Sequence, residues 1–374
     1  MRYLRKLSWL YWLWMTTRIK HLYLHVPFCN SICFYCDFCH RVYDEKLAYR
    51  WLDRLKSEIE DNCKDKYETI YIGGGTPSSL NEDQLERLLT MIDPYTGECL
   101  EYTVEINPES LSEDKICILK KHRVNRISMG VQSSDDQILR SLNRRHDFAC
   151  AKEKIALLKR YGFENISVDL MYSLPGQDLD ILNRTIDDIL GLDVKHVSLY
   201  SLTIEENSVF GKKGIDHLDE DIEADMYELI DSRMNEAGYI HYEISNFCKE
   251  GYQSRHNMGY WDYDDFLGLS AGASGKIGNN RYSNTRSLER YLNEKDIRDE
   301  DLHLSRKEMM FENIMMSLRT IYGLDIEEFN RKYDSDLIRE YPLGISNKYI
   351  EIRDGKMFCT KPEILNSILL DFMD

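Results

Sequence analysis

Short apolar runs of strand length alternate with helical patterns along the first two-thirds of the chain. Between the runs, polar stretches with apolar residues three and four apart predict helices, such as "NEDQLERLLTMI" from Asn81 and "SEDKICILKKH" from Ser112. A repeat of strand and helix predicts a parallel sheet covered by helices, in a barrel or a doubly wound sheet. The six predicted strands are 21–26, 69–74, 102–107, 126–131, 166–172 and 196–202.

Polar and glycine-rich residues lie at the carboxyl end of each predicted strand. Four cysteines follow the first strand, "GGGTPS" the second, "EINPES" ends the third and "VQSS" the fourth, while Asp169 lies in the fifth and Thr203 follows the sixth. Chemistry at the ends of all strands is typical of a TIM-type barrel, whereas a doubly wound sheet concentrates it at one switch point. We therefore expect an α/β fold built on a partial (β/α)6 TIM-type barrel.

The pattern changes after about residue 300. "MMFENIMMSLRTIYGLDIEEF" predicts a helix with Met310, Ile314 and Leu318 on one stripe, and "YIEIRDGKMFCTK" predicts a hairpin that turns at Asp354 and Gly355. A last helix is expected over 362–373. These elements predict a small C-terminal α+β domain of winged-helix-like type at 296–374, after a barrel core at 17–295.

The first residues, "MRYLRKLSWLYWLWMTT", combine basic and aromatic residues. The run is far shorter than the ~20 apolar residues that span a bilayer, and no small-residue cleavage site follows it. We expect residues 1–16 to be an N-terminal extension, with a peripheral membrane contact as the alternative.

The composition limits which binding partners and which cellular compartment we expect. The 374 residues carry a formal net charge of −17, which argues against a nucleic-acid partner because phosphate binding needs basic patches. Six of the ten cysteines are scattered without the spacing of a disulfide framework. We therefore expect a reducing, cytoplasmic compartment.

The other four cysteines, Cys29, Cys33, Cys36 and Cys39, lie within eleven residues. Four thiolates can hold zinc, although structural zinc sites usually draw their ligands from two separated pairs. The first three, spaced C-x-x-x-C-x-x-C, can instead hold three irons of a [4Fe–4S] cluster and leave the fourth iron open. The aromatic residues between them would shield such a cluster from water.

C-x-x-x-C-x-x-C after a first strand, with a glycine motif after the second, resembles the radical S-adenosylmethionine (SAM) superfamily. In that superfamily the open iron chelates SAM, and an electron from the cluster cleaves its sulfonium. Ten motifs between about residues 23 and 275 follow the order of the oxygen-independent coproporphyrinogen oxidase-like family, and are most similar to its HemW branch of heme chaperones. They are "YLHVPFC", "CDF", "GGGTPS", "EINPES", "RISMGVQS", "LNRRH", "SVDLMYSLPGQ", "YSLTIE", "AGYIHYEISNF" and "RHNMGYWDYDDFLGLSAGA".

The resemblance implies roles for individual residues. Cys29, Cys33 and Cys36 match the cluster ligands, while Cys39 has no assigned role. The glycines would let the backbone approach SAM and leave N–H donors free for its carboxylate. The positions that match SAM contacts are Tyr23, Tyr35, Gly74, Gly75, Thr76, Glu105, Gln132, Arg144 and Asp169.

"HNMGYW" matches a motif associated with heme in the HemW branch, which implies heme contacts by His256, Tyr260 and Trp261. The implied function is a heme chaperone that passes heme to acceptor proteins, as a monomer or a homodimer. The alternatives are an oxygen-independent coproporphyrinogen oxidase, which decarboxylates propionate side chains, and a radical SAM enzyme with another substrate. "GASG" at 272–275 departs from a family G-A-H-S, so the histidine that a multi-histidine heme site would use is Ser274 here. Whether the protein is an enzyme stays open.

Overall fold

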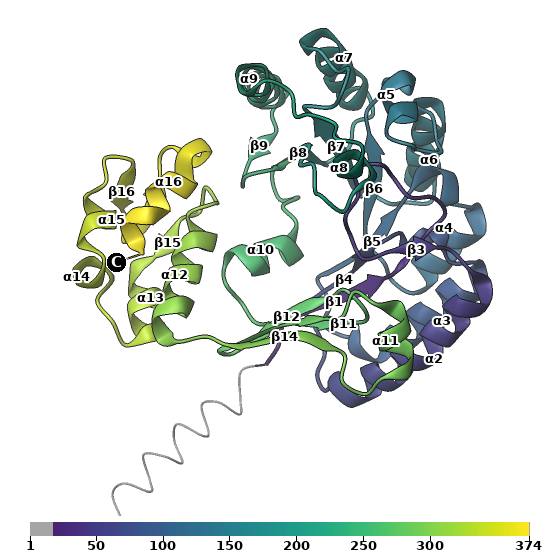
Figure 1. The fold of residues 1–374 in the computed structure, drawn as a ribbon, viewed down its shortest axis with the longest axis horizontal. Coiled ribbons are helices and arrows are strands. Elements are labelled where there is room, and N and C mark those ends of the chain that lie inside the picture. The colour runs from purple at the N-terminus through teal and green to yellow at the C-terminus, as the bar shows by residue number, and fades with distance from the viewer. Residues whose placement is uncertain (1–17, 374) are drawn as a thin grey trace, which may run out of the picture.

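The computed structural model describes residues 18–373, so the predicted extension at 1–16 lies outside the described residues. Six parallel strands lie side by side and form the barrel wall, as predicted (Figure 1). Each lies within one residue of its predicted bounds. They are β1 (His21–Val26), β4 (Thr69–Gly74), β5 (Glu101–Ile106), β6 (Arg126–Gln132), β7 (Asn165–Tyr172) and β8 (His196–Ser201).

Helices connect these strands and cover the outer face of the sheet (Figure 1). Asn81 caps the predicted second helix in a full capping box with Gln84, as its sequence signature indicates. The apolar sides of the helices and the strands form one large buried core, which includes Trp51 and Leu55. The covering helices are α2 (Glu45–Asn62), α3 (Glu82–Ile92), α4 (Glu113–Lys121), α5 (Asp136–Ser141), α6 (Phe148–Arg160) and α7 (Leu179–Leu190).

The sheet continues beyond both ends of the six-stranded wall and does not close into a full barrel. Beside β1, β11 (Phe266–Leu269) is parallel, and an antiparallel series of β12 (Ser274–Ile277), β13 (Asn280–Asn284) and β14 (Arg298–His303) follows it. Beside β8 lie β10 (Asn246–Cys248) and β9 (Ile240–His241). The strand β14 follows the predicted domain boundary at residue 295, yet it pairs with β13 of the large sheet.

Further helices lie between the last barrel strand and the C-terminal region. They are α8 (Val209–Lys212), α9 (Glu220–Glu236), α10 (Arg255–Trp261) and α11 (Leu288–Asn293). The helix α10 carries the "HNMGYW" motif and lies between the barrel strands and the C-terminal helices (Figure 1). It contacts both β4 and the first C-terminal helix.

The C-terminal region has a second core, which contains the predicted stripe of Met310, Ile314 and Leu318. Its three-stranded sheet contains the predicted hairpin, which turns at Asp354 and Gly355, both with positive φ. Helices and a small sheet match the predicted α+β type. The elements are α12 (Arg306–Ser317), β15 (Leu324–Asp325), α13 (Ile326–Tyr333), α14 (Leu337–Glu340), α15 (Pro342–Ser346), β16 (Ile350–Arg353), β17 (Lys356–Cys359) and α16 (Leu365–Leu369). Within residues 18–373, no helix has the length and apolar character needed to cross a membrane.

Candidate functional site

The cysteine loop begins directly after β1, where Cys29 ends the two-residue strand β2 (Phe28–Cys29). Cys29 is buried and its Sγ lies 3.5 Å from the Thr76 hydroxyl, while Cys33 and Cys36 are half-buried. Burial raises the pKa of Cys29 to about 12 and that of Cys36 to about 11. Thiolates at these positions need a positive partner, and a bound metal centre is the kind of partner that supplies it. The donor set therefore fits an iron–sulfur cluster.

Cys29, Cys33 and Cys36 lie near enough for their charges to act on one another. No three His, Cys, Asp or Glu side chains in the described part of the chain are close enough to hold a single metal ion. Cys39 is buried in the barrel core, where its thiol donates to the Arg286 carbonyl at 3.2 Å. Its backbone carbonyl also bonds to His25 Nε2 at 2.7 Å.

The glycine motif packs tightly at the end of β4. Gly74 has φ of +108°, and a Cβ there would lie 2.5 Å from the His25 ring. Glu105 accepts a hydrogen bond from the Gly74 amide at 3.0 Å and another from the Tyr71 hydroxyl at 2.7 Å. Burial and the charge of Asp169 raise the pKa of Glu105 to about 7.

The prediction that the amides of this motif are free donors is wrong. The amides of Gly75 and Thr76 bond to the carbonyls of Val26 and Phe28, and the Gly74 amide is held by a carboxylate. The glycines therefore serve close packing of the turn, because a Cβ at Gly75 would lie 2.6 Å from the Phe28 carbonyl oxygen.

Arg144 connects the cysteine loop with the ends of β5 and β6. Its guanidinium donates to the Cys33 Sγ at 3.4 Å, to the Asn107 Oδ1 at 2.8 Å and to the Gly130 carbonyl. Asn107 in turn donates to the Thr76 hydroxyl at 3.1 Å. Sequence reasoning missed Asn107, although "EINPES" contains it. Three segments that are distant in sequence, at Cys33, Asn107 and Gly130, therefore meet at one cation.

The remaining predicted SAM positions lie on the inner side of the barrel or at its rim. Asp169 accepts a hydrogen bond from Ser128 at 3.1 Å, and burial raises its pKa. Gln132 ends β6 with φ of +70°, a strained conformation of the kind that concentrates at functional sites. Tyr23 bonds to His25 Nδ1 at 3.0 Å, and Tyr35 lies beside Cys33, whose charge adds to burial in raising the pKa of this phenol.

One buried cation in the barrel was not predicted from the sequence. Arg126 on β6 is 2% exposed, and its Nε has no hydrogen-bond partner among the described residues. The negative charges of Glu101 and Asp169 outweigh the effect of burial and raise its pKa. Arg126 is the first residue of the predicted strand 126–131, and nothing in the sequence pattern assigned it a role.

The "HNMGYW" helix lies toward the amino ends of the strands, because His256 reaches Thr69, the first residue of β4. His256 is 1% exposed, and both ring nitrogens are hydrogen-bonded, Nδ1 to Thr69 and Nε2 to Tyr260, each at 2.7 Å. Both imidazole nitrogens are therefore paired within the protein, and the heme contact of His256 stays a prediction. Tyr260 and Trp261 are half-buried, and the Trp261 indole N–H has no partner within the described chain.

Comparisons with known proteins agree with the site. The sequence profile described as the Radical SAM superfamily matches residues 23–189. The chain is 40% identical over 337 residues to the heme chaperone HemW of Lactococcus lactis, covering 87% of this chain and 88% of that protein. It is 38% identical over 339 residues to the heme chaperone HemW of Bacillus subtilis, covering 87% and 89%.

Among solved structures, coproporphyrinogen III oxidase (HemN) from Escherichia coli aligns with a TM-score of 0.84. The alignment covers 98% of this chain and 93% of that one at 19% sequence identity. At this identity the likeness establishes a shared fold alone.

Proposed function

Because the chain belongs to the HemW family of heme chaperones within the radical SAM superfamily, we propose that it binds heme and transfers it to acceptor proteins. The observation that carries this proposal is 40% identity to a heme chaperone HemW across 87% of the chain. The family also implies a [4Fe–4S] cluster and SAM as cofactors.

Cys29, Cys33 and Cys36 would hold the cluster, because they are the thiols at the end of β1 and Arg144 donates to one of them. When bound, the cluster would supply an electron for cleavage of the SAM sulfonium. The chain's own residues prepare the site: Phe34 and Tyr35 are half-buried beside the cysteines, whereas Phe38 is 71% exposed and does not give the shielding expected of it. Arg144 fixes the loop against β6.

SAM would lie across the carboxyl ends of the strands. Glu105 and Asp169 offer carboxylates to its amine and ribose hydroxyls, and Arg144 contributes positive charge. The proposed contacts are Tyr23, Tyr35, Gly74, Gly75, Thr76, Glu105, Gln132, Arg144 and Asp169.

Heme would contact Tyr260 and Trp261, whose partly exposed rings can stack on a porphyrin. His256 would act by holding Tyr260. We also propose a division into a barrel domain and a C-terminal domain, a cytoplasmic location and heme-accepting proteins as partners.

The test separates a chaperone from a decarboxylase. The anaerobically reconstituted full chain is given reductant, SAM and coproporphyrinogen, and in parallel is loaded with heme and mixed with a heme-free acceptor. We expect no protoporphyrinogen, together with transfer of heme that is faster than release into buffer. Sustained decarboxylation without a stable heme complex would favour the oxidase.

A further inference from the structure

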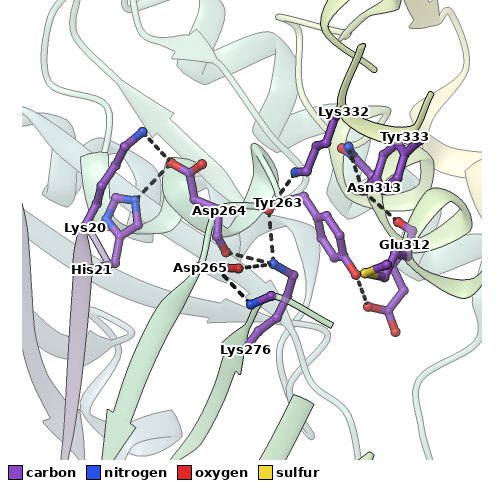
Figure 2. Close-up of polar contacts among 12 residues, drawn as sticks. Lys20, His21, Tyr263, Asp264, Asp265, Lys276, Glu312, Asn313, Lys332 and Tyr333 are labelled. Carbon is purple, nitrogen blue, oxygen red and sulfur yellow. Dashed lines mark hydrogen bonds and ion pairs between the residues drawn. The ribbon is translucent and has the colours of Figure 1, made fainter. Parts of the chain in front are cut away.

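A continuous chain of hydrogen bonds leads from the protein surface to Tyr260. Asp264 Oδ2 lies 3.3 Å from His21 Nε2, and His21 Nδ1 lies 2.7 Å from the Thr69 hydroxyl. The same hydroxyl lies 2.7 Å from His256 Nδ1, and His256 Nε2 lies 2.7 Å from the Tyr260 hydroxyl. The outer end, where Lys20 and His21 reach Asp264, is seen in Figure 2.

Asp264 and Tyr260, the two ends of this hydrogen-bond series, differ in their access to solvent. The Asp264 side chain is 33% exposed, whereas His21, Thr69 and His256 are 5%, 2% and 1% exposed. Tyr260 is half-buried, and the charge of Glu105 contributes to its environment inside the barrel. The hydrogen bonds therefore connect the solvent with the barrel interior through residues that are themselves buried.

The fold holds these residues in place by several independent contacts. His21 and Thr69 are opposite each other in the β1–β4 pairing. Gly259 lets α10 approach, since a Cβ there would lie 2.5 Å from His21 Nε2. The histidine, glycine and tyrosine of "HNMGYW" thus all take part in this one arrangement.

The loop that carries Asp264 is fixed from both sides (Figure 2). Tyr263, with φ of +57°, donates its hydroxyl proton to Glu312 at 2.7 Å. Its carbonyl accepts from Lys276 and from Lys332, each at 3.3 Å, and Lys276 also contacts Asp265 at 2.8 Å. The carboxylate of Asp264 is thereby kept against His21.

The number of protons allows the hydrogen bonds of this series to run in either of two directions. The Thr69 hydroxyl has one hydrogen, so it donates to one imidazole and accepts from the other. When His21 is neutral, it donates from Nε2 to Asp264 and accepts from Thr69. Thr69 then accepts from His256 Nδ1, and Tyr260 donates to His256 Nε2.

When His21 takes up a proton, every bond further along reverses. The imidazolium donates to both Asp264 and Thr69, Thr69 donates to His256 Nδ1, and His256 donates from Nε2 to Tyr260. The Tyr260 hydroxyl hydrogen is then free to point into the barrel. Every bond of the series keeps one donor and one acceptor in both arrangements, which differ by one proton, and only the Tyr260 hydroxyl hydrogen is left without a partner when His21 is protonated.

We propose that His21, Thr69, His256 and Tyr260 form a proton relay between the solvent beside Asp264 and a carboxylate or other basic oxygen of a ligand inside the barrel. Tyr260 gives its hydroxyl proton to that oxygen and receives one from His256 Nε2. His256 Nδ1 takes the Thr69 proton, and Thr69 takes the Nδ1 proton of His21, which becomes neutral. The net result is one proton moved from His21 to the ligand. Only the identity of the ligand depends on the proposed function.

The charges around this hydrogen-bond series allow a proton to pass through it without staying on His256. Burial and the positive charges of His21 and Arg126 lower the pKa of His256, so this imidazole stays neutral. Burial and Glu105 raise the pKa of Tyr260, so it stays protonated. Burial alone would raise the pKa of Asp264, but the hydrogen bond with His21 and the charge of Lys20 outweigh burial and lower it. The other charged or titratable groups that face the chain are Asp262, Glu101, Tyr23 and Tyr71.

The direct test reads the tautomer of His256 by NMR in the full chain with 15N-labelled histidine, without added heme or SAM. Ring nitrogen shifts distinguish a protonated from an unprotonated position. Between about pH 8 and pH 5, the range in which histidine changes its charge, we expect His256 to change from the Nδ1–H to the Nε2–H form. This change should have the same midpoint as proton uptake at His21.

Thr69→Val keeps the shape of the side chain and removes the hydroxyl, so the two histidines should become independent. Thr69→Ser, the matched control, should restore the coupled change. Asp264→Asn should move the common midpoint to lower pH, and it keeps the test available if Thr69→Val does not fold. A fixed His256 tautomer in the wild type, or a coupled change that persists in Thr69→Val, would overturn the relay.

Discussion

Replacing Glu105 with glutamine should change how the stability of the protein depends on pH. Glu105 is half-buried at the end of β5, where it accepts hydrogen bonds from Tyr71 and Gly74. Burial and the charge of Asp169 raise its pKa from 4.5 to about 7, because the ionised form is poorly solvated there. Glutamine keeps the size and an acceptor oxygen but does not ionise.

The sign follows from proton counting. Between about pH 4.5 and pH 7 the folded protein binds a proton at Glu105 that the unfolded chain has lost. The contribution of Glu105 to stability is therefore fully present below this window and is lost as the pH rises through it. At ~1.4 kcal/mol per pH unit, the loss is on the order of 3 kcal/mol above pH 7. Glu105→Gln should gain stability relative to the wild type by this amount across the window.

Urea unfolding followed by circular dichroism, at half-unit pH steps, measures the difference between the two proteins. The exposed variant Glu351→Gln on β16 is the control for removal of one surface charge. A stability difference that does not vary with pH, or that favours the wild type as pH rises, would refute the proposed cost of ionising Glu105.

Three further outcomes are expected. Alanine at all three predicted cluster cysteines should abolish iron uptake on anaerobic reconstitution, whereas Cys39→Ala should keep most of it, since that thiol bonds to a backbone carbonyl; equal loss in both would contradict the ligand assignment. Gly74→Val should weaken SAM binding by at least ~10-fold in calorimetry, because the new Cβ would clash with the His25 ring. Asp169→Ala should weaken SAM binding too. Unchanged affinity in both variants would show that SAM binds elsewhere. Phe329→Ala in the C-terminal core should lower the free energy of unfolding of that region by ~3–5 kcal/mol, and a loss below ~1 kcal/mol by urea unfolding would mean that this core is loosely packed.

The sequence predicted the parts of the fold that have strong periodicity. The six barrel strands are nearly continuous apolar runs because both faces are buried, and their bounds were correct within one residue. The added strands could not be found in this way. β14 reads "RDEDLH", and most of its side chains are exposed, so it has no apolar pattern. β9 and β10 have two and three residues, which is too short for a period to appear.

The sequence identified many residues of the candidate site but few of the contacts between them. The cysteines stood out by their spacing, and Glu105 and Asp169 because carboxylates are rare in apolar strands. Asn107, which pairs with Arg144, and Arg126, which faces Asp169, did not, because only the folded sheet brings these residues together. The motif identified His256, but its burial depends on β4 and Gly259, which pack against it from distant parts of the chain.

The central claim, that this chain is a heme chaperone with a heme site at the "HNMGYW" helix, is tested most directly by titrating heme into the full chain. The account predicts a saturable Soret band that is weakened in Trp261→Ala and in Tyr260→Leu. The control Tyr349→Phe, in the C-terminal region, should bind as the wild type does. Absence of a saturable complex would contradict the chaperone, and equal binding by all four proteins would contradict the assigned heme site.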